Sequence, residues 1–183
     1  MTGLSTGIAP PSIIGTARLI LRPPVAADAE AIAEVANDWE VASRLGRLPH
    51  PYGVEDARWF LENIVPVEIV WAIQNRSENV IMGLVGLTPG GPGQAELGYW
   101  LGRGYWGAGF MTEAAGPVVA YGFEHLGLQM LTASWFRENP ASGRVLEKVG
   151  FQRVGHGERS SGVSGEPRPT AEMKMDPPTP PVA

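Results

Sequence analysis

A glycine-rich segment between a predicted strand and a predicted helix is the feature that most constrains this chain. Residues 94–101 are rich in β-forming side chains, residues 102–109 contain four glycines, and residues 112–125 are typical of a helix. Successive backbone N–H groups at a helix N-terminus attract anions, and missing side chains let a phosphate approach closely. The segment therefore predicts a cradle for a diphosphate, built by the amides from Trp106 to Met111.

Two other phosphate-binding loops fit less well. A Walker A loop needs Gly-Lys-Ser/Thr, which is absent here. Residues 102–107 match the dinucleotide pattern GxGxxG, but a lone match is weak. This match lies past the middle of the chain, has Trp106 beside its third glycine, and has no acid in the next strand, where Thr132, Ala133 and Ser134 stand. A nicotinamide-cofactor enzyme is thus a minor alternative.

The remaining elements follow from hydrophobic periodicity and from turn residues. We expect strands at 16–22, 68–73, 80–87, 94–101, 130–135, 151–154 and 170–175, and helices at 29–36, 57–64, 112–125 and 140–149. Asn139 is expected to cap the last helix and Gly150 to end it. This order predicts an α/β fold, with a mixed sheet of about seven strands flanked on both faces by about four helices.

Length and composition restrict the function classes. The 183 residues suit one domain, expected at 14–176 between flexible tails at 1–13 and 177–183. Nineteen acids against fourteen bases make a nucleic-acid partner unexpected. The chain lacks cysteine and its three histidines are far apart, so no metal site is expected. Without a signal peptide or a long apolar stretch, we expect a cytoplasmic protein with no membrane partner.

Four sequence blocks carry a resemblance to a known family. They are Arg18-Leu-Ile-Leu-Arg-Pro23, Glu96-Leu-Gly-Tyr-Trp-Leu101, Tyr105-Trp-Gly-Ala-Gly-Phe-Met-Thr-Glu-Ala114, and Asn139-Pro-Ala-Ser142 leading to Val145-Leu-Glu-Lys-Val-Gly-Phe151. In this order and spacing, over roughly residues 16–154, the chain resembles the RimJ/RimL branch of the GNAT N-acetyltransferases. The resemblance implies the GNAT fold and acetyl-CoA as co-substrate.

The resemblance also assigns residues to CoA. It lays the pyrophosphate loop of the family on residues 104–109, where Gly104 replaces the usual Gln or Arg and Arg103 is adjacent. The implied CoA-binding residues are Trp100, Leu101, Arg103, Gly104, Trp106, Gly107, Ala108, Gly109, Phe110, Met111, Thr112, Asn139 and Ser142.

Two side chains are the implied catalytic residues. Glu96 lies on the strand expected to face the thioester and shares a face with Gly98 and Trp100, so apolar surroundings would suit it as a base, directly or through water. The alternative is a solvated Glu. Ser142 resembles the serine that this branch places near the CoA sulfur, or it serves only the first helical turn. A backbone N–H at Trp100 or Leu101 is implied as the oxyanion donor.

Other residues receive weaker assignments. The tyrosine that many GNAT enzymes use towards the thiolate is replaced here by Leu146. We interpret Glu113 as structural, because an acid complements the helix dipole. A set of aromatic side chains offers two interpretations, a lining for the acceptor groove or part of the core, and we expect the core: Trp39, Trp59, Phe60 and Trp71. His50 and Tyr52 lie in a loop that in this family shapes the amine pocket.

The predicted function is transfer of the acetyl group of acetyl-CoA to a primary amine. The acceptor is a peptide N-terminus or a small molecule, and the amine attacks directly without a covalent enzyme intermediate. Similar proteins are often homodimers. The alternative is a CoA-binding or regulatory module without turnover, which the missing tyrosine and Gly104 would favour.

Overall fold

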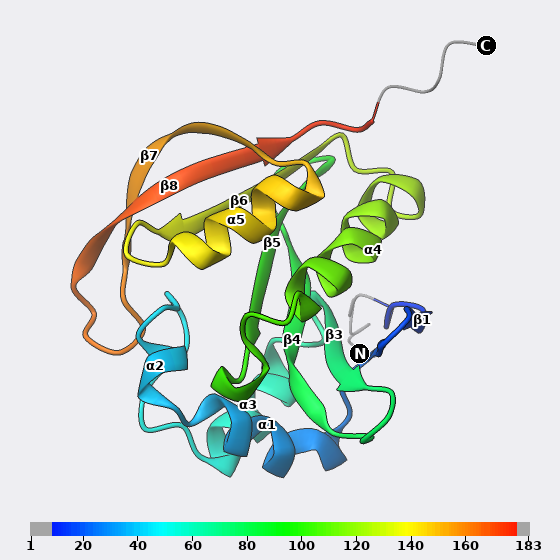
Figure 1. Ribbon diagram of the computed structural model, residues 1–183, viewed down its shortest axis with the longest axis vertical. Helices are drawn as coiled ribbons and strands as arrows, with labels where there is room; N and C mark the ends of the chain where they lie inside the picture. Colours follow the sequence, from blue (N-terminus) through cyan, green and yellow to red (C-terminus); the bar gives the residue numbers. More distant parts are fainter. Residues whose placement is uncertain (1–8, 179–183) are drawn as a thin grey trace, which may run out of the picture.

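The computed structural model describes residues 9–178, which form one mixed sheet with helices on both faces (Figure 1). The strands are β1 (Ile14–Gly15), β2 (Leu19–Arg22), β3 (Ile69–Asn75), β4 (Ile81–Pro89), β5 (Gln94–Leu101), β6 (Met130–Phe136), β7 (Gln152–Ser160) and β8 (Pro167–Met175). The helices are α1 (Ala29–Ala36), α2 (Trp39–Ala42), α3 (Val54–Asn63), α4 (Phe110–Glu124) and α5 (Pro140–Val149), with short 3-10 turns η1 (Ala26–Asp28) and η2 (Arg103–Tyr105).

The sheet has one parallel pair, and that pair comes apart along its length. The strand order is β1-β2-β3-β4-β5-β6-β8-β7, and all neighbours are antiparallel except β5 and β6. These two strands pair only from Gln94 opposite Met130 to Glu96 opposite Thr132. Beyond that point β5 remains paired with β4, and β6 remains paired with β8. A gap therefore opens inside the sheet.

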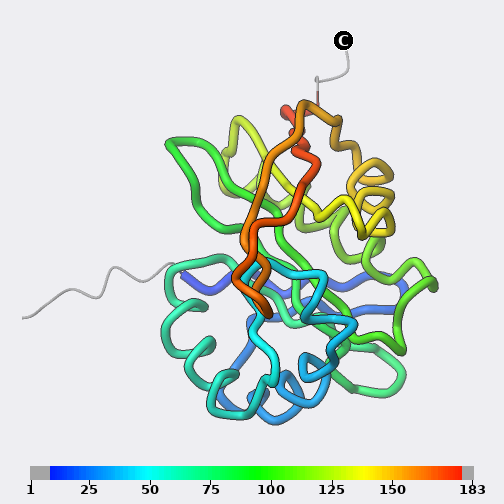
Figure 2. The backbone as a smooth tube through the Cα atoms, turned by 90° about the vertical axis from the view of Figure 1, so that its left-hand side faces the viewer, coloured from blue at the N-terminus to red at the C-terminus, as the bar shows by residue number. Residues whose placement is uncertain are grey.

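Alternating side chains bury the two faces of the sheet against different helices. On one face, Val85 and Leu87 of β4 belong to the same core cluster as Ala115 and Val118 of α4. On the other, Leu84 packs with the small and branched residues of α1 and α3. The two helix groups lie on opposite sides of the sheet (Figure 2). Full burial of one Leu or Val contributes about 1.5–3 kcal/mol, so both faces hold the helices firmly.

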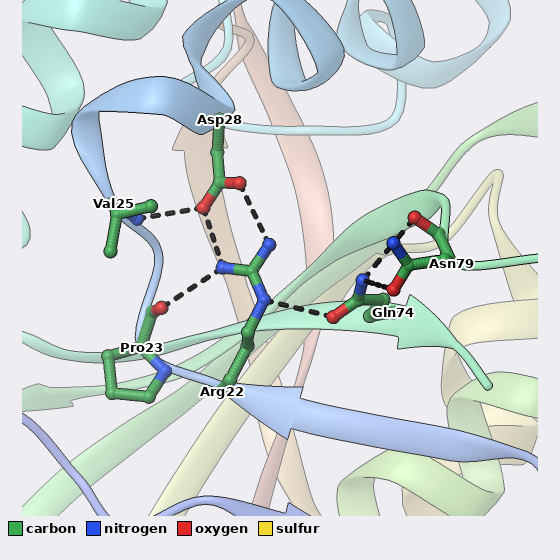
Figure 3. A network of polar contacts seen from close by, with 6 residues as sticks. All are labelled: Arg22, Pro23, Val25, Asp28, Gln74 and Asn79. Carbon is green, nitrogen blue, oxygen red and sulfur yellow. Dashed lines mark hydrogen bonds and ion pairs between the residues drawn. The ribbon is translucent and has the colours of Figure 1, made fainter.

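A polar network ties the end of β2 to η1 and to the β3–β4 turn (Figure 3). The Arg22 guanidinium donates to both carboxylate oxygens of Asp28, at 2.7 and 2.8 Å, and to Gln74, which in turn donates to Asn79. The Val25 amide also donates to Asp28. Burial alone would raise the pKa of Asp28, but its hydrogen bonds and the charge of Arg22 outweigh that effect and lower it. The network fixes the entry of the chain into α1.

The predicted α/β fold with helices on both faces is confirmed, and the differences have local causes. The structure adds β1 and the single turn of α2, which are too short to show a period. It lengthens the last two strands, because β7 has no buried residue and its sequence therefore lacks an apolar alternation. The side chain of Asn139 does not cap α5; its carbonyl accepts from the Ser142 amide instead.

The expected tails lie largely outside the described residues. Positions 1–8 and 179–183 are not described. Within the expected N-terminal tail, Pro11 is buried and the Ser12 carbonyl accepts a hydrogen bond from the indole of Trp71 at 2.9 Å. The packed region therefore begins before residue 14. In residues 9–178, no helix has the length and apolar character needed to span a membrane.

Candidate active site

A large cleft runs through the gap between β5 and β6. Its volume is about 1530 Å³. It is lined by the diverging part of β5, by Ser134–Phe136 of β6, by the glycine segment and the start of α4, by the first turns of α5, and by the loop between α2 and α3. One cavity thus connects the predicted phosphate cradle with Glu96 and Ser142.

The backbone amides at the start of α4 are free to bind an anion. Within the described part of the chain, no acceptor is bonded to the amides from Gly107 to Thr112, and the first helical bond comes from Glu113 to the Gly109 carbonyl. Gly107 and Gly109 have φ of 75° and 79°, a region that favours glycine. A Cβ on Gly107 would meet nothing within 4 Å. A diphosphate fits this open, amide-lined cradle.

The cradle begins one residue later than the sequence suggests. The Trp106 amide already donates to the Arg103 carbonyl at 3.2 Å, and its indole donates to the Leu101 carbonyl at 2.8 Å. Trp106 therefore braces the loop against the end of β5. Arg103, Gly104 and Ala108 do not line the cleft.

Contacts from the β1–β2 turn hold the cradle in place. Arg18 donates to the Ala108 carbonyl at 3.0 Å and to Glu113 at 2.7 Å, and its guanidinium lies 4.2 Å from the ring centre of Phe110. Thr16 also donates to Glu113. Burial alone would raise the pKa of Glu113, but the hydrogen bonds from Thr16 and Arg18 and the positive charge lower it. Glu113 lies in the first turn of α4 and has the structural role expected of it. The contacts of Arg18 with Ala108 and Glu113 could not be expected from the sequence.

Glu96 lies in the cleft, but its surroundings are polar. Its Oε1 forms an ion pair with Arg159 of β7 at 2.7 Å and lies 3.5 Å from the Ser134 hydroxyl. The expected apolar environment is therefore wrong, because β7, which the sequence predicted too short, brings Arg159 to this place. The Glu96 side chain is 32% exposed. Its Oε2 has no hydrogen-bond partner in residues 9–178.

Ser142 and Tyr99 meet on the other side of the sheet. Ser142 lies in the first turn of α5 and lines the cleft. The Tyr99 hydroxyl lies 2.9 Å from the Ser142 carbonyl oxygen and 3.0 Å from its Oγ. Burial raises the pKa of Tyr99. Leu146, which replaces the usual tyrosine, is buried in the core. Sequence reasoning missed Tyr99 because its partner is 43 residues away.

The backbone at the end of β5 presents peptide groups to the gap. A Cβ on Gly83 of β4 would lie 2.1 Å from the Trp100 carbonyl oxygen, so Trp100 faces β4. Peptide groups alternate along a strand, and those of Tyr99 and Leu101 therefore face the gap. Of the two predicted oxyanion donors, Leu101 is the one directed to the cleft.

Aromatic side chains line the opposite half of the cleft. Trp59, Phe60 and Tyr52 contribute to it, and burial, followed by the charge of Asp56, raises the pKa of Tyr52 to about 12. The predicted core position holds for Trp71, which is fully buried. It is wrong for Trp39 and Trp59, which are more than half exposed, and Trp59 lines the cleft instead.

Other predicted residues have clear positions as well. Phe110, Met111, Thr112, Asn139 and Trp100 all line the cleft. His50 does not line it; its ring lies edge-on to Trp39, with ring centres 5.6 Å apart. Groups of three or more metal-binding side chains do not occur among residues 9–178.

Comparison with known proteins decides the family. The model of the acetyltransferase (GNAT) domain matches residues 18–152. The chain belongs to the GNAT family. This GNAT protein is 35% identical over 150 residues to the N-acetyltransferase YoaA of Bacillus subtilis, covering 78% of this chain and 84% of YoaA. It is an acetyl-CoA-dependent N-acetyltransferase with RimJ/RimL-like character.

Solved structures agree with this fold. A GNAT-family acetyltransferase from Bacillus anthracis superposes with a TM-score of 0.78 at 25% identity, covering 90% of this chain and 98% of its own. Mycobacterium smegmatis RimJ, solved with CoA-disulfide, superposes with a TM-score of 0.77 at 22% identity, covering 91% of this GNAT chain and 88% of RimJ. The predicted GNAT fold is confirmed, with eight strands in place of about seven.

Proposed function

We propose that this GNAT protein transfers the acetyl group of acetyl-CoA to a primary amine, by direct attack while both substrates occupy the cleft. The acceptor is a peptide N-terminus or a small-molecule amine. One observation carries the proposal: the free amides from Gly107 to Thr112 share a single cleft with Glu96 and Ser142. Two substrates held in one cleft react with an effective concentration far above that in solution.

The chain supplies each group that acyl transfer needs. The amides of Gly107 to Thr112 bind the diphosphate, which leaves the acyl end of the donor to reach the gap between β5 and β6. The Leu101 N–H donates to the carbonyl oxygen as negative charge develops there. This donor is part of a strand, so it needs no reorganisation during the reaction.

Glu96 and Ser142 act on opposite sides of the reacting carbon. The amine nitrogen forms a bond to the acetyl carbon and passes a proton to Glu96 Oε2, directly or through water. The C–S bond then breaks, and the electron pair leaves with the sulfur. The Ser142 hydroxyl donates a hydrogen bond to the departing thiolate. Arg159 holds Glu96 by Oε1, which keeps Oε2 directed to the acceptor.

Thiol release from acetyl-CoA, measured against a panel of peptides and small amines, tests this function. We expect Glu96→Gln to lower kcat about 100-fold, the usual effect of losing a general base. Glu55→Gln is the control, because the Glu55 side chain is 84% exposed on α3, away from the cleft. Activity unchanged by both Glu96→Gln and Ser142→Ala would contradict the assigned roles.

The absence of the usual tyrosine favours one competing function. Leu146 lines the cleft with a hydrocarbon side chain, so it offers no donor to a thiolate. A module that binds CoA without turnover would show tight CoA binding, measured by calorimetry, together with no thiol release over the whole panel. That pair of results would replace the enzymatic proposal.

A further inference from the structure

Tyr99 lies where the sheet opens. It is three residues beyond Glu96, the last residue of β5 that pairs with β6. Its ring points to the same face as Leu97 and Leu101 and packs against the core cluster that includes α4. Since its neighbour β6 has moved away, the hydroxyl of Tyr99 reaches α5 and ends at Ser142.

The Tyr99 and Ser142 hydroxyls have one hydrogen each, and this limits which hydrogen bonds can form between the two residues. The Ser142 carbonyl can only accept, whereas each hydroxyl has one hydrogen and can also accept. If Tyr99 donates to the Ser142 carbonyl, the serine hydrogen goes to the Tyr99 oxygen. If Tyr99 donates to the Ser142 Oγ instead, the serine hydrogen is free to point to a third group. In residues 9–178, Ser142 Oγ has no partner other than Tyr99. The third group is therefore whatever occupies the cleft.

The tyrosine acts as a hydrogen-bond donor and not as an acid. Burial raises the pKa of Tyr99, so its hydroxyl keeps its proton throughout the pH range of an acetyltransferase assay. A buried hydroxyl without a hydrogen-bond partner would cost free energy. The bond between the Tyr99 hydroxyl and Ser142 is therefore favoured in the fold. The bond also crosses from a sheet strand to a helix, so it fixes the hydroxyl relative to the gap.

We propose that Tyr99 is a positioning residue, which by its hydrogen bond holds the Ser142 hydroxyl directed at the sulfur of the departing thiolate. This inference rests on the proposed function, in which Ser142 donates to that sulfur. Tyr99 itself does not touch the substrate. It acts through Ser142 Oγ, and because its hydroxyl has a single hydrogen, donation to Oγ takes the place of donation to the Ser142 carbonyl.

A double-mutant cycle separates these two contacts, because Ser142→Ala removes Oγ and keeps the carbonyl. We expect Tyr99→Phe to lower kcat about tenfold, the loss of roughly 1.4 kcal/mol, and to change the KM for acetyl-CoA less than about twofold. In the Ser142→Ala background, the same change should lower kcat less than about twofold. An equal loss in both backgrounds would show that Tyr99 only anchors the helix and would overturn the proposal.

Tyr121→Phe is the matched control. Tyr121 is a half-buried tyrosine of α4 that does not line the cleft, and its hydroxyl has no hydrogen bond in the described residues. We expect its kcat to equal that of the wild type. If Tyr121→Phe lowered kcat as much as Tyr99→Phe, the loss would come from general destabilisation and the proposal would fall.

Crystal structures with CoA test the inference without any acceptor. If no amine in the panel is acetylated, the proposed function fails, but the position of Ser142 can still be compared between wild type and Tyr99→Phe. We expect the hydroxyl to point to the CoA sulfur in the wild type and to rotate away in the variant. An unchanged Ser142 rotamer in Tyr99→Phe would overturn the positioning role.

Discussion

Gly107 has a backbone conformation that favours glycine, at a position that faces open space. Its φ of 75° disfavours a side chain, and the space where a Cβ would stand is open cleft. We expect Gly107→Ala to weaken CoA binding about tenfold, because a left-handed backbone conformation costs an L-residue about 1–2 kcal/mol and the loop would shift to avoid it. Calorimetric titration with CoA measures this.

Gly165→Ala is the matched control for backbone strain. Gly165 has φ of 71° and also has open space around it, but it lies in the β7–β8 loop, outside the cleft. It should lower stability by a similar amount and leave CoA affinity unchanged. Equal CoA affinity in Gly107→Ala and the wild type would contradict the cradle.

Glu113 should make stability depend on pH. Its pKa is lowered in the fold from 4.5, so its contribution is present above about pH 4.5 and is lost as pH falls through the native value. Glu113→Gln should therefore unfold at lower urea concentration than the wild type at pH 7, and this difference should shrink below about pH 4.5. A difference that stays constant with pH would show that the charge of Glu113 contributes nothing.

The turn η1 depends on a single ion pair. Arg22 and Asp28 are largely buried and satisfy each other with two hydrogen bonds. We expect Asp28→Ala to lower the free energy of unfolding by about 3 kcal/mol, because it leaves a partly buried guanidinium unpaired. Thermal or urea denaturation measures the loss.

An exposed ion pair provides the comparison. Arg58 and Glu55 on α3 are paired, but both side chains are at least half exposed. Glu55→Ala should cost less than about 0.5 kcal/mol, because water screens the pair. If both substitutions cost the same, burial would not be what gives the Arg22–Asp28 pair its strength.

Elements with a one-sided apolar pattern could be predicted, and exposed or very short ones could not. α1 has Ile32, Ala33 and Ala36 buried at helical spacing, and its predicted bounds match the structure. β7 is held by backbone pairing to β8 with no buried side chain, so its composition resembles that of a loop. Helix α4 continues through Pro117, which shows that core packing overrides a local preference.

The same distinction applies to the candidate site. The glycine cradle is one continuous segment, and its residues could be found from their spacing. Arg18, Tyr99 and Arg159 act on residues 95, 43 and 63 positions away. Contacts of this kind exist only after the β1–β2 turn, α5 and β7 have been brought to the cleft, and one sequence has no pattern that encodes them.

For the molecule as a whole, CoA should act as a stabilising ligand. Its proposed site joins β5, α4 and α5, which must all be folded to form the cleft. At a CoA concentration 100 times the Kd, binding adds about 2.7 kcal/mol. For a domain of this size, that should raise the Tm by roughly 5–10 °C.

Calorimetric or fluorescence melting with and without CoA measures this shift, and pantetheine is the control because it lacks the diphosphate. Pantetheine at the same concentration should raise the Tm much less. Equal shifts with both compounds would mean that the amides of the cradle do not bind the diphosphate.

The separation of β5 from β6 leaves the sheet with an edge in its own interior. An ordinary edge strand invites pairing with another protein and carries the hazard of aggregation. Here the Tyr99 peptide group and the Leu101 N–H face a cleft bordered by α5 and by the α2–α3 loop, whereas the Leu101 carbonyl accepts from the Trp106 indole. We expect these walls to favour a slender molecule with amide groups over an edge strand of another sheet. We therefore expect these free peptide groups to bind a small ligand and not a strand of another protein.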